Sequence, residues 1–179
     1  DIYRVNGGTA PTQPWTGSGR VLTKVGTGTL TFANASAGTF DFTIDDVAGS
    51  KAITQQIFET AGVPPSINYT DLWWNKNESG WGVSLTQQFG IIFAAWYAYG
   101  ANGEPVWYVA TNCPVTPTGC SGVLYQVTGG APLTAVWKGI NPPVAVGNVA
   151  FDFTDAANGT MTYTINGIQS SRVITRQVY

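Results

Sequence analysis

Val146 to Tyr179 reads VGNVAFDFTDAANGTMTYTINGIQSSRVITRQVY, and a related pattern stands at Val25 to Phe58 as VGTGTLTFANASAGTFDFTIDDVAGSKAITQQIF. The two stretches align without a gap, and 12 of 34 positions are identical. The match continues upstream, where Trp15 falls on Trp137. The chain therefore carries one duplicated unit, and its two copies flank a middle third that has no counterpart.

Alternation of apolar and polar residues within the duplicated unit predicts antiparallel strands. Over Thr160 to Ile165, three apolar residues alternate with three threonines. Asn166-Gly167, which follows, is the strongest two-residue hairpin signal in the chain, whereas Asp45-Asp46 occupies that position in the first copy. We expect each copy to form four or five antiparallel strands with one apolar face.

We call the duplicated unit C and the unmatched middle N, so that the chain is built from half-repeats in the order C-N-C. No helical period is found anywhere, so the predicted fold class is all-β: an antiparallel barrel or a two-sheet sandwich built from these C-N-C half-repeats. One N plus one C supplies eight or nine strands, enough to close a small barrel. The predicted strands are 2–6, 20–33, 38–45 and 50–58 in the first C, 70–75, 80–88, 90–99 and 105–111 in N, and 123–128, 134–140, 147–154, 160–166 and 171–179 in the second C.

The predicted organisation is a first C half-repeat at 1–60, a linker at 61–67, an N half-repeat at 68–122 and a second C half-repeat at 123–179. Either 68–179 forms one folding unit, or all of 1–179 is a single domain. A C half-repeat without its own N has an uncovered apolar face and unpaired sheet edges. Three outcomes follow: both C units pack on the single N, another molecule completes the first C, or the first C is a truncated unit. A missing N upstream of Asp1 would make the chain a fragment of a longer array.

Composition restricts the classes of function. Charged residues make up 10% of the chain, against about 25% in ordinary soluble domains, and aromatic residues make up 13%. The net charge of -2 and the absence of a basic cluster argue against nucleic acid as a partner. The longest apolar run, Ile91 to Tyr99, is too short for a transmembrane helix.

Cys113 and Cys120 are the only cysteines, and they lie in the proline- and glycine-rich stretch NCPVTPTGCSG. Because the chain has no histidine, two thiolates cannot complete a four-ligand zinc site. We therefore expect a disulfide between them, which places the protein in an oxidising setting: secreted, on the cell surface or in the periplasm.

Aromatic residues concentrate in N, and amide side chains lie near them. Such a set either fills the core or forms a ligand site for a carbohydrate or an apolar small molecule. The candidate ligand-binding residues are Trp73, Trp74, Asn75, Asn77, Glu78, Trp81, Gln87, Trp96, Tyr97 and Trp107.

The string NESGWGVSLTQQ at Asn77 to Gln88, the strand that follows it and the G-x-P-x-W-Y pattern at Gly103 resemble a tandem β-repeat of secreted or envelope proteobacterial proteins. The second C half-repeat, with ITRQ at Ile174 to Gln177, is similar to the second half of that repeat. The resemblance implies an architecture and a compartment, and it implies no activity.

Catalytic residues, metal ligands and cofactors are not predicted, because the absence of histidine excludes the usual nucleophile–base pairs and no carboxylate spacing supplies a metal site. Paired carboxylates among Asp71, Glu78 and Glu104 of N would suit glycoside hydrolysis, but acidic residues in polar turns are ordinary, so an enzyme is not predicted. Two functions are favoured. The first is a non-enzymatic secreted or envelope protein with a structural or interaction role, associating into a homo-oligomer or polymer through its first half-repeat. The alternative is a ligand-binding β module that uses the aromatic segment 71–108.

Overall fold

The computed structural model describes residues 1–17 and 19–178, and all regular structure in them is β-strand, which confirms the predicted all-β class. The strands are β1 (Ile2–Asn6), β2 (Val21–Asn34), β3 (Ala37–Ile44), β4 (Val47–Thr54), β5 (Asp71–Trp74), β6 (Gly82–Gln88), β7 (Ile91–Tyr99), β8 (Pro105–Pro114), β9 (Gly119–Val127), β10 (Val144–Phe153), β11 (Asn158–Ile165) and β12 (Ile168–Arg176). The described residues include no helix able to cross a membrane. Tyr179, the last residue of the final predicted strand, lies outside the described residues.

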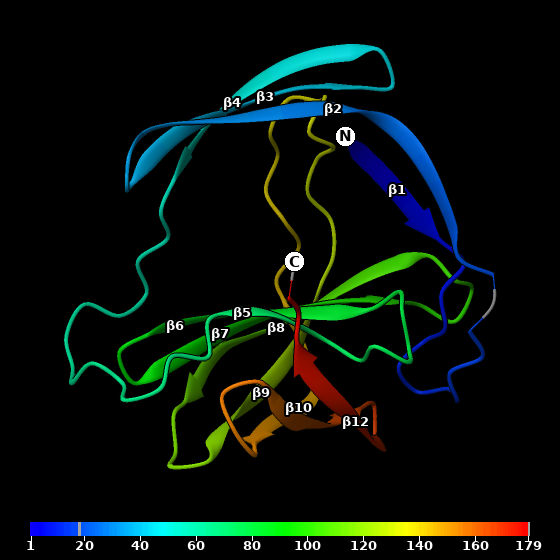
Figure 1. Ribbon diagram of the computed structural model, residues 1–179. Coiled ribbons are helices and arrows are strands. Elements are labelled where there is room, and N and C mark those ends of the chain that lie inside the picture. Colours follow the sequence, from blue (N-terminus) through cyan, green and yellow to red (C-terminus); the bar gives the residue numbers. More distant parts are fainter. Residues whose placement is uncertain (18, 179) are drawn as a thin grey trace.

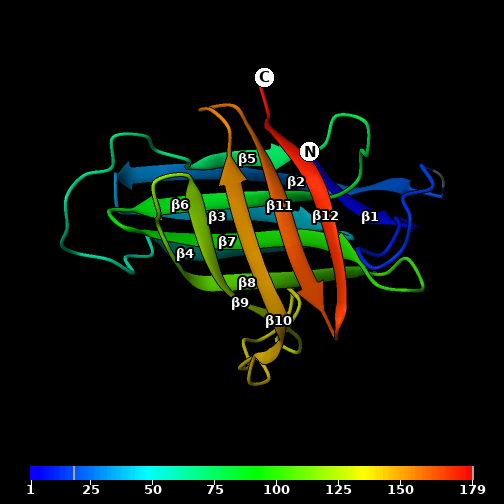
Figure 2. The ribbon, with the colours of Figure 1, turned by 90° about the horizontal axis from the view of Figure 1, so that it is seen from below.

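Strands β5 to β12 close an antiparallel barrel in which each strand pairs with its neighbours in sequence and β12 returns to β5. Viewed from below, β10 to β12 cross β6 to β8 at a steep angle (Figure 2). The barrel joins the N and second C half-repeats, and no strand of the first C half-repeat enters it. Of the two predicted architectures, the barrel is therefore the one that these half-repeats form.

The barrel core is filled from both half-repeats. Strict alternation of buried and less buried residues runs along β6 and β11, as the sequence pattern predicts. Trp73 and Ile92 from N meet Phe151, Tyr163 and Ile174 from the second C, and these five side chains are at most 2% exposed. The N half-repeat therefore covers the apolar face of the second C half-repeat.

The barrel closes at a short seam between β12 and β5. Two residue pairs, Thr175 with Trp74 and Arg176 with Trp73, form the ladder, and the Gln177 amide donates to the Leu72 carbonyl at 2.8 Å. The Arg176 guanidinium lies 5.3 Å from the centre of the Trp73 ring and donates to the Asn68 carbonyl at 2.9 Å. Gln55 occupies the equivalent position in the first copy, so that copy lacks this cation.

Strands β1 to β4 form a separate four-stranded sheet that spans the space above the barrel (Figure 1). Its register equals that of β9 to β12: Gly26 pairs with Ile44 as Gly147 pairs with Ile165. The β1–β2 ladder skips Val25, and the β9–β10 ladder skips the equivalent Val146. The duplication thus produces the same sheet twice, once as part of the barrel wall and once as a separate sheet.

The two-residue turns also correspond. Asn166 and Gly167 both have positive φ angles, 51° and 83°, as the hairpin signal predicts. Asp45 and Asp46 adopt φ angles of 47° and 63°, so the first copy keeps the turn without its glycine. Aspartate tolerates this left-handed region better than most residues.

The predicted strand at 134–140 is wrong. The chain between β9 and β10 is a long loop. Its one β-bridge within the described residues pairs Gly129 with Ile140. Pro132 before the segment and Pro142-Pro143 after it lack the amide donors that a ladder needs. Val136 is 90% exposed in this loop.

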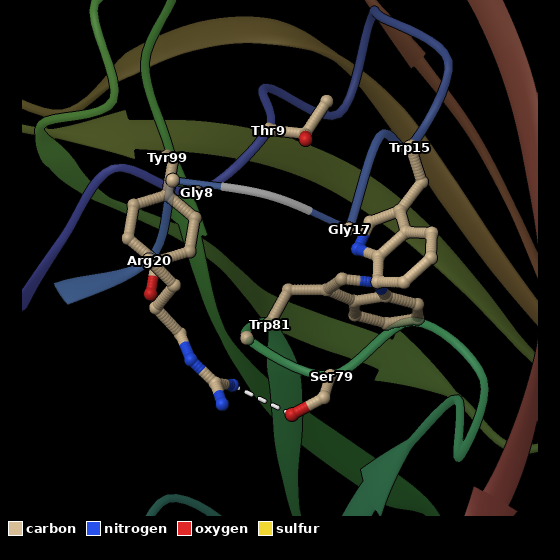
Figure 3. Close-up of a pocket in the computed structure, with 10 residues that line it drawn as sticks. Gly8, Thr9, Trp15, Gly17, Arg20, Ser79, Trp81 and Tyr99 are labelled. Carbon is tan, nitrogen blue, oxygen red and sulfur yellow. Dashed lines mark hydrogen bonds between the residues drawn. The ribbon is translucent and has the colours of Figure 1, made fainter. Parts of the chain in front are cut away.

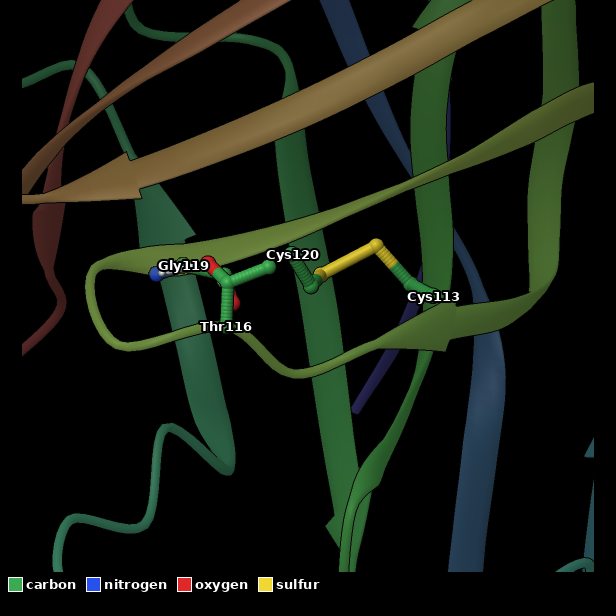
Figure 4. The surroundings of a disulfide bond; sticks show 4 residues. All are labelled: Cys113, Thr116, Gly119 and Cys120. Carbon is green, nitrogen blue, oxygen red and sulfur yellow. Dashed lines mark hydrogen bonds between the residues drawn. A yellow bond between two sulfur atoms is a disulfide. The ribbon is translucent and has the colours of Figure 1, made fainter.

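The predicted disulfide is confirmed. Cys113 at the end of β8 bonds to Cys120 at the start of β9, with 5.3 Å between their Cα atoms (Figure 4). The Thr116 hydroxyl and the Gly119 carbonyl, 3.1 Å apart, close the hairpin between the two cysteines. Both cysteines are buried in the barrel core, and the bond is compatible with an oxidising compartment.

Phe153 and Phe32 occupy equivalent positions, but Phe153 is 7% exposed and stacks on Tyr69 with 3.7 Å between the ring centres, whereas Phe32 is 66% exposed. Phe153→Ala is expected to lower the free energy of unfolding by about 3–5 kcal/mol, because it opens a cavity in the core. Phe32→Ala is expected to lower it by less than about 1 kcal/mol. Denaturant unfolding monitored by near-UV circular dichroism measures both values, and equal losses would contradict the uncovered state of the first sheet.

Candidate functional site

Three of the sequence-predicted site residues belong to the core or to its hydrogen bonds. Trp73 is fully buried and its indole nitrogen donates to the Tyr69 carbonyl at 3.0 Å. Trp96 is 3% exposed and lies 4.6 Å from the Tyr163 ring centre. Gln87 is 7% exposed and accepts from the Tyr69 amide at 2.9 Å. These side chains have no surface to offer a ligand in this arrangement.

Three more aromatic candidates lie near or on the outside of the barrel wall. Tyr97 and Trp107 come from neighbouring strands β7 and β8 and meet edge to face, 5.3 Å between ring centres. Trp107 is 56% exposed, and Trp74 is half-buried at the barrel seam. The outer pair is therefore spatially separate from the buried tryptophans.

The remaining candidates lie in the β5–β6 connection at one end of the barrel. Asn75 accepts the Asn77 amide at 2.9 Å, which shapes the turn. Glu78 accepts from the Trp81 indole at 3.2 Å and pairs with Arg172 of β12 at 3.4 Å. This connection is thus held to both half-repeats of the barrel.

A pocket of about 270 Å³ opens at this end of the barrel, next to Trp81 (Figure 3). Ser79, Gly80, Trp81 and Tyr99 come from the barrel. The other side comes from the β1–β2 connection of the first copy, and the lining residues there are Gly8, Thr9, Trp15, Gly17, Gly19 and Arg20. Figure 3 shows the Trp15 and Trp81 rings close together at one side of the pocket.

The β1–β2 connection is anchored on the barrel by backbone contacts. The Gly7 amide donates to the Gly103 carbonyl at 2.8 Å, and the Tyr163 hydroxyl donates to the Pro11 carbonyl at 2.8 Å. Gly8 lies so close to the Tyr99 ring that an added Cβ would stand 2.0 Å from it. A glycine is therefore required at position 8 if the connection is to reach the barrel.

Arg20 and Tyr99 set the electrostatics of the pocket. The Arg20 guanidinium donates to the Ser79 hydroxyl at 2.6 Å, and no carboxylate within the described residues pairs with it. Burial raises the pKa of the Tyr99 hydroxyl, and the Arg20 charge partly opposes that rise. The pocket therefore combines aromatic surface with one cation that has only a neutral partner.

The carboxylates of N have structural partners. Asp71 lies 3.7 Å from the Arg176 guanidinium, and Glu104 accepts the Asn102 amide at 3.1 Å in the β7–β8 turn. No group of three metal-ligating side chains occurs within residues 1–17 and 19–178. The described side chains thus present no constellation typical of a metal centre.

Sequence reasoning found Trp81 but missed Trp15 and Arg20. The signal that could have pointed to Trp15 is its alignment with Trp137, because this is the one aromatic residue that the β1–β2 and β9–β10 connections share. Trp137 is 71% exposed in the equivalent β9–β10 loop. The pocket could not be derived from either unit separately, because its two sides come from different half-repeats.

A second surface of note is the apolar face of the β1–β4 sheet. Leu30 is 56% exposed where its equivalent Phe151 is 1% exposed. Phe42 is buried, however, because its ring lies over Gly49 of the neighbouring strand. The face is therefore covered by its own aromatic rings along β3 and uncovered along β2.

Comparison of the chain with protein-family models, curated proteins and solved structures found no match. The geometry described above is therefore the basis for the functional argument.

Gly8→Val is expected to detach the β1–β2 connection from the barrel, because the new side chain would collide with the Tyr99 ring. Acrylamide quenching of tryptophan fluorescence is expected to increase as Trp15 and Trp81 become accessible. Gly139→Val is the matched control, since an added Cβ there meets nothing within 4 Å. Equal quenching in both variants would contradict the docking of the connection.

Proposed function

We propose that this protein is a non-enzymatic interaction protein, secreted, on the cell surface or in the periplasm, that self-associates through its first C half-repeat. One observation carries the proposal: the β1–β4 sheet has the register of β9–β12 but lacks the cover that the N half-repeat gives to β9–β12. The disulfide and the resemblance to envelope repeats support the compartment.

The contrast between the two sheets indicates what the first one lacks. Burying a large apolar side chain stabilises a fold by about 1.5–3 kcal/mol relative to leaving it exposed. Phe153 has this stabilisation and Phe32 does not, although both lie on the same face of equivalent sheets. The N half-repeat of the same chain is already used by the barrel, so a second copy of the chain is the proposed source of further contacts.

The double variant Leu30→Ser and Phe32→Ser is expected to weaken self-association at least tenfold, because it removes the exposed apolar side chains of β2. Light scattering coupled to size exclusion over a concentration series measures the change. The control is Thr29→Ser with Thr31→Ser, which alters the opposite face of the same strand. A mass of one chain at every concentration would refute self-association.

Carbohydrate recognition is the second candidate function, and the pocket at Trp15 and Trp81 favours it. Aromatic rings stack on the apolar faces of sugars, and the polar groups of Arg20, Ser79 and Thr9 suit hydroxyl or carboxylate groups better than an apolar ligand. The unpaired charge of Arg20 selects sugars that carry a carboxylate.

Trp15→Ala is expected to reduce the affinity for uronate-containing oligosaccharides at least tenfold, as measured by isothermal titration calorimetry. Trp137→Ala is the matched control, because this equivalent tryptophan lies in the other connection and does not line the pocket. Absence of heat with both neutral and acidic oligosaccharides, or equal losses in the two variants, would argue against this function.

A further inference from the structure

A small cavity adjoins the pocket at Trp15 and Trp81. Its volume is about 10 Å³, which is room for about one atom of the size of a water oxygen. Thr9, Trp15 and Trp81 line both the cavity and the pocket, so the two spaces share one wall. Trp15 belongs to the β1–β2 connection and is 37% exposed, so a small displacement of its ring joins the two spaces.

The cavity is bounded by a hydrogen-bond donor that has no partner. Trp96 of β7 lines the cavity and is 3% exposed. Its indole Nε1 is buried, and no acceptor within the described residues lies within hydrogen-bond distance of it. The equally buried indole of Trp73 does have a partner, since it donates to the Tyr69 carbonyl at 3.0 Å. Because a buried donor without an acceptor lowers stability, an acceptor atom in the cavity would compensate for this loss.

The other polar groups that border the cavity already have partners. The Tyr163 hydroxyl donates to the Pro11 carbonyl at 2.8 Å. The Arg172 guanidinium pairs with the Glu78 carboxylate at 3.4 Å. Much of the remaining wall is apolar, and the Ala98 side chain is part of it. The unmet requirement of the cavity is therefore a single neutral acceptor.

Sugars carry three kinds of acceptor that could meet this requirement: carboxylates, hydroxyls and acetamido carbonyls. A carboxylate would bury a charge beside Arg172, whose own charge is already paired, and such burial is costly. A hydroxyl would bring a proton that needs a further acceptor within the cavity. A carbonyl oxygen is uncharged and only accepts, so it is the group that suits Trp96 best.

A carboxylate has a separate place in the outer pocket. The Arg20 guanidinium lines that pocket, and its hydrogen bond at 2.6 Å goes to the neutral Ser79 hydroxyl. Figure 3 shows Arg20 across the pocket from the Trp15 and Trp81 rings. A ligand that lies between them would therefore direct an acidic group to one side and an acetamido group to the other.

We propose that the pocket binds an acidic sugar that also carries an acetamido group, and that Trp96 recognises this group. The acetyl oxygen occupies the cavity and accepts from the Trp96 indole nitrogen. The sugar ring stacks on Trp15 and Trp81, and its carboxylate pairs with Arg20. This inference rests on the carbohydrate function proposed above and specifies which groups the sugar must carry.

Two acids that differ only in the acetamido group test the specificity. N-acetylglucosaminuronate is expected to bind at least tenfold more tightly than glucuronate, which has a hydroxyl at the same ring carbon. N-acetylglucosamine, which lacks the carboxylate, is expected to bind at least tenfold more weakly than N-acetylglucosaminuronate. Isothermal titration calorimetry measures the three affinities on the unmodified chain.

Trp96→Phe tests the donor, because it removes the indole N–H and keeps an aromatic ring. The affinity for N-acetylglucosaminuronate is expected to fall about tenfold, and that for glucuronate by less than twofold. Trp73→Phe is the matched control, since Trp73 is an equally buried tryptophan that lines neither space. It is expected to change both affinities less than twofold. Far-UV circular dichroism verifies that both variants keep the fold.

A measurement on the unmodified chain covers the case in which Trp96→Phe does not fold. The indole N–H signal of Trp96 in a heteronuclear NMR spectrum is expected to shift with N-acetylglucosaminuronate, because the proton becomes hydrogen-bonded. Glucuronate is expected to leave this signal in place. Selective labelling of tryptophan resolves the seven indole signals of the chain.

The outcomes separate the two proposals. Absence of binding with all three sugars would refute both carbohydrate recognition and the role of Trp96. Equal affinities for the two acids, an unmoved Trp96 signal, or equal losses in Trp96→Phe and Trp73→Phe would overturn acetamido recognition alone. Carbohydrate recognition at Trp15 and Trp81 would then stand.

Discussion

Closure of the barrel is the constraint on which the rest of the structure depends. A four-stranded C sheet has one apolar face and two edges. The face must be covered and the edges must find hydrogen-bond partners at the same time. The N half-repeat does this for β9 to β12 by filling the interior and by pairing β5 with β12. Arg176 strengthens that seam through Trp73 and the Asn68 carbonyl. With a single N in the described chain, only one C sheet is completed.

Much of the fold could be predicted because the signals are local. Alternation fixes which residues of β11 face inward, and Asn166-Gly167 fixes the turn that follows. The disulfide followed from two cysteines in one short hairpin. The prediction of a strand at 134–140 was wrong for a local reason as well. The residues alternate as in a strand, but the prolines on either side remove amide donors that a ladder needs.

The candidate site could be predicted only in part, because it depends on contacts between distant segments. Both faces of Ile91–Tyr99 are apolar in the sequence, so alternation does not show whether Trp96 lies in the core or faces a ligand. Its contact with the Tyr163 ring required the second C half-repeat to be placed. The same holds for Trp15, which meets the barrel only because Gly8 permits close approach to Tyr99.

The order of the half-repeats has a consequence for biosynthesis. The β1–β2 connection docks on Ser79, Gly103 and Tyr163, all of which leave the ribosome after it. The first sheet is therefore complete while its docking site is still being translated. Throughout that interval the exposed apolar side chains Leu30 and Phe32 of β2 are present before the barrel has formed, and such surface favours aggregation. The order of the half-repeats thus places the period of greatest aggregation risk early in synthesis, before the barrel residues are available.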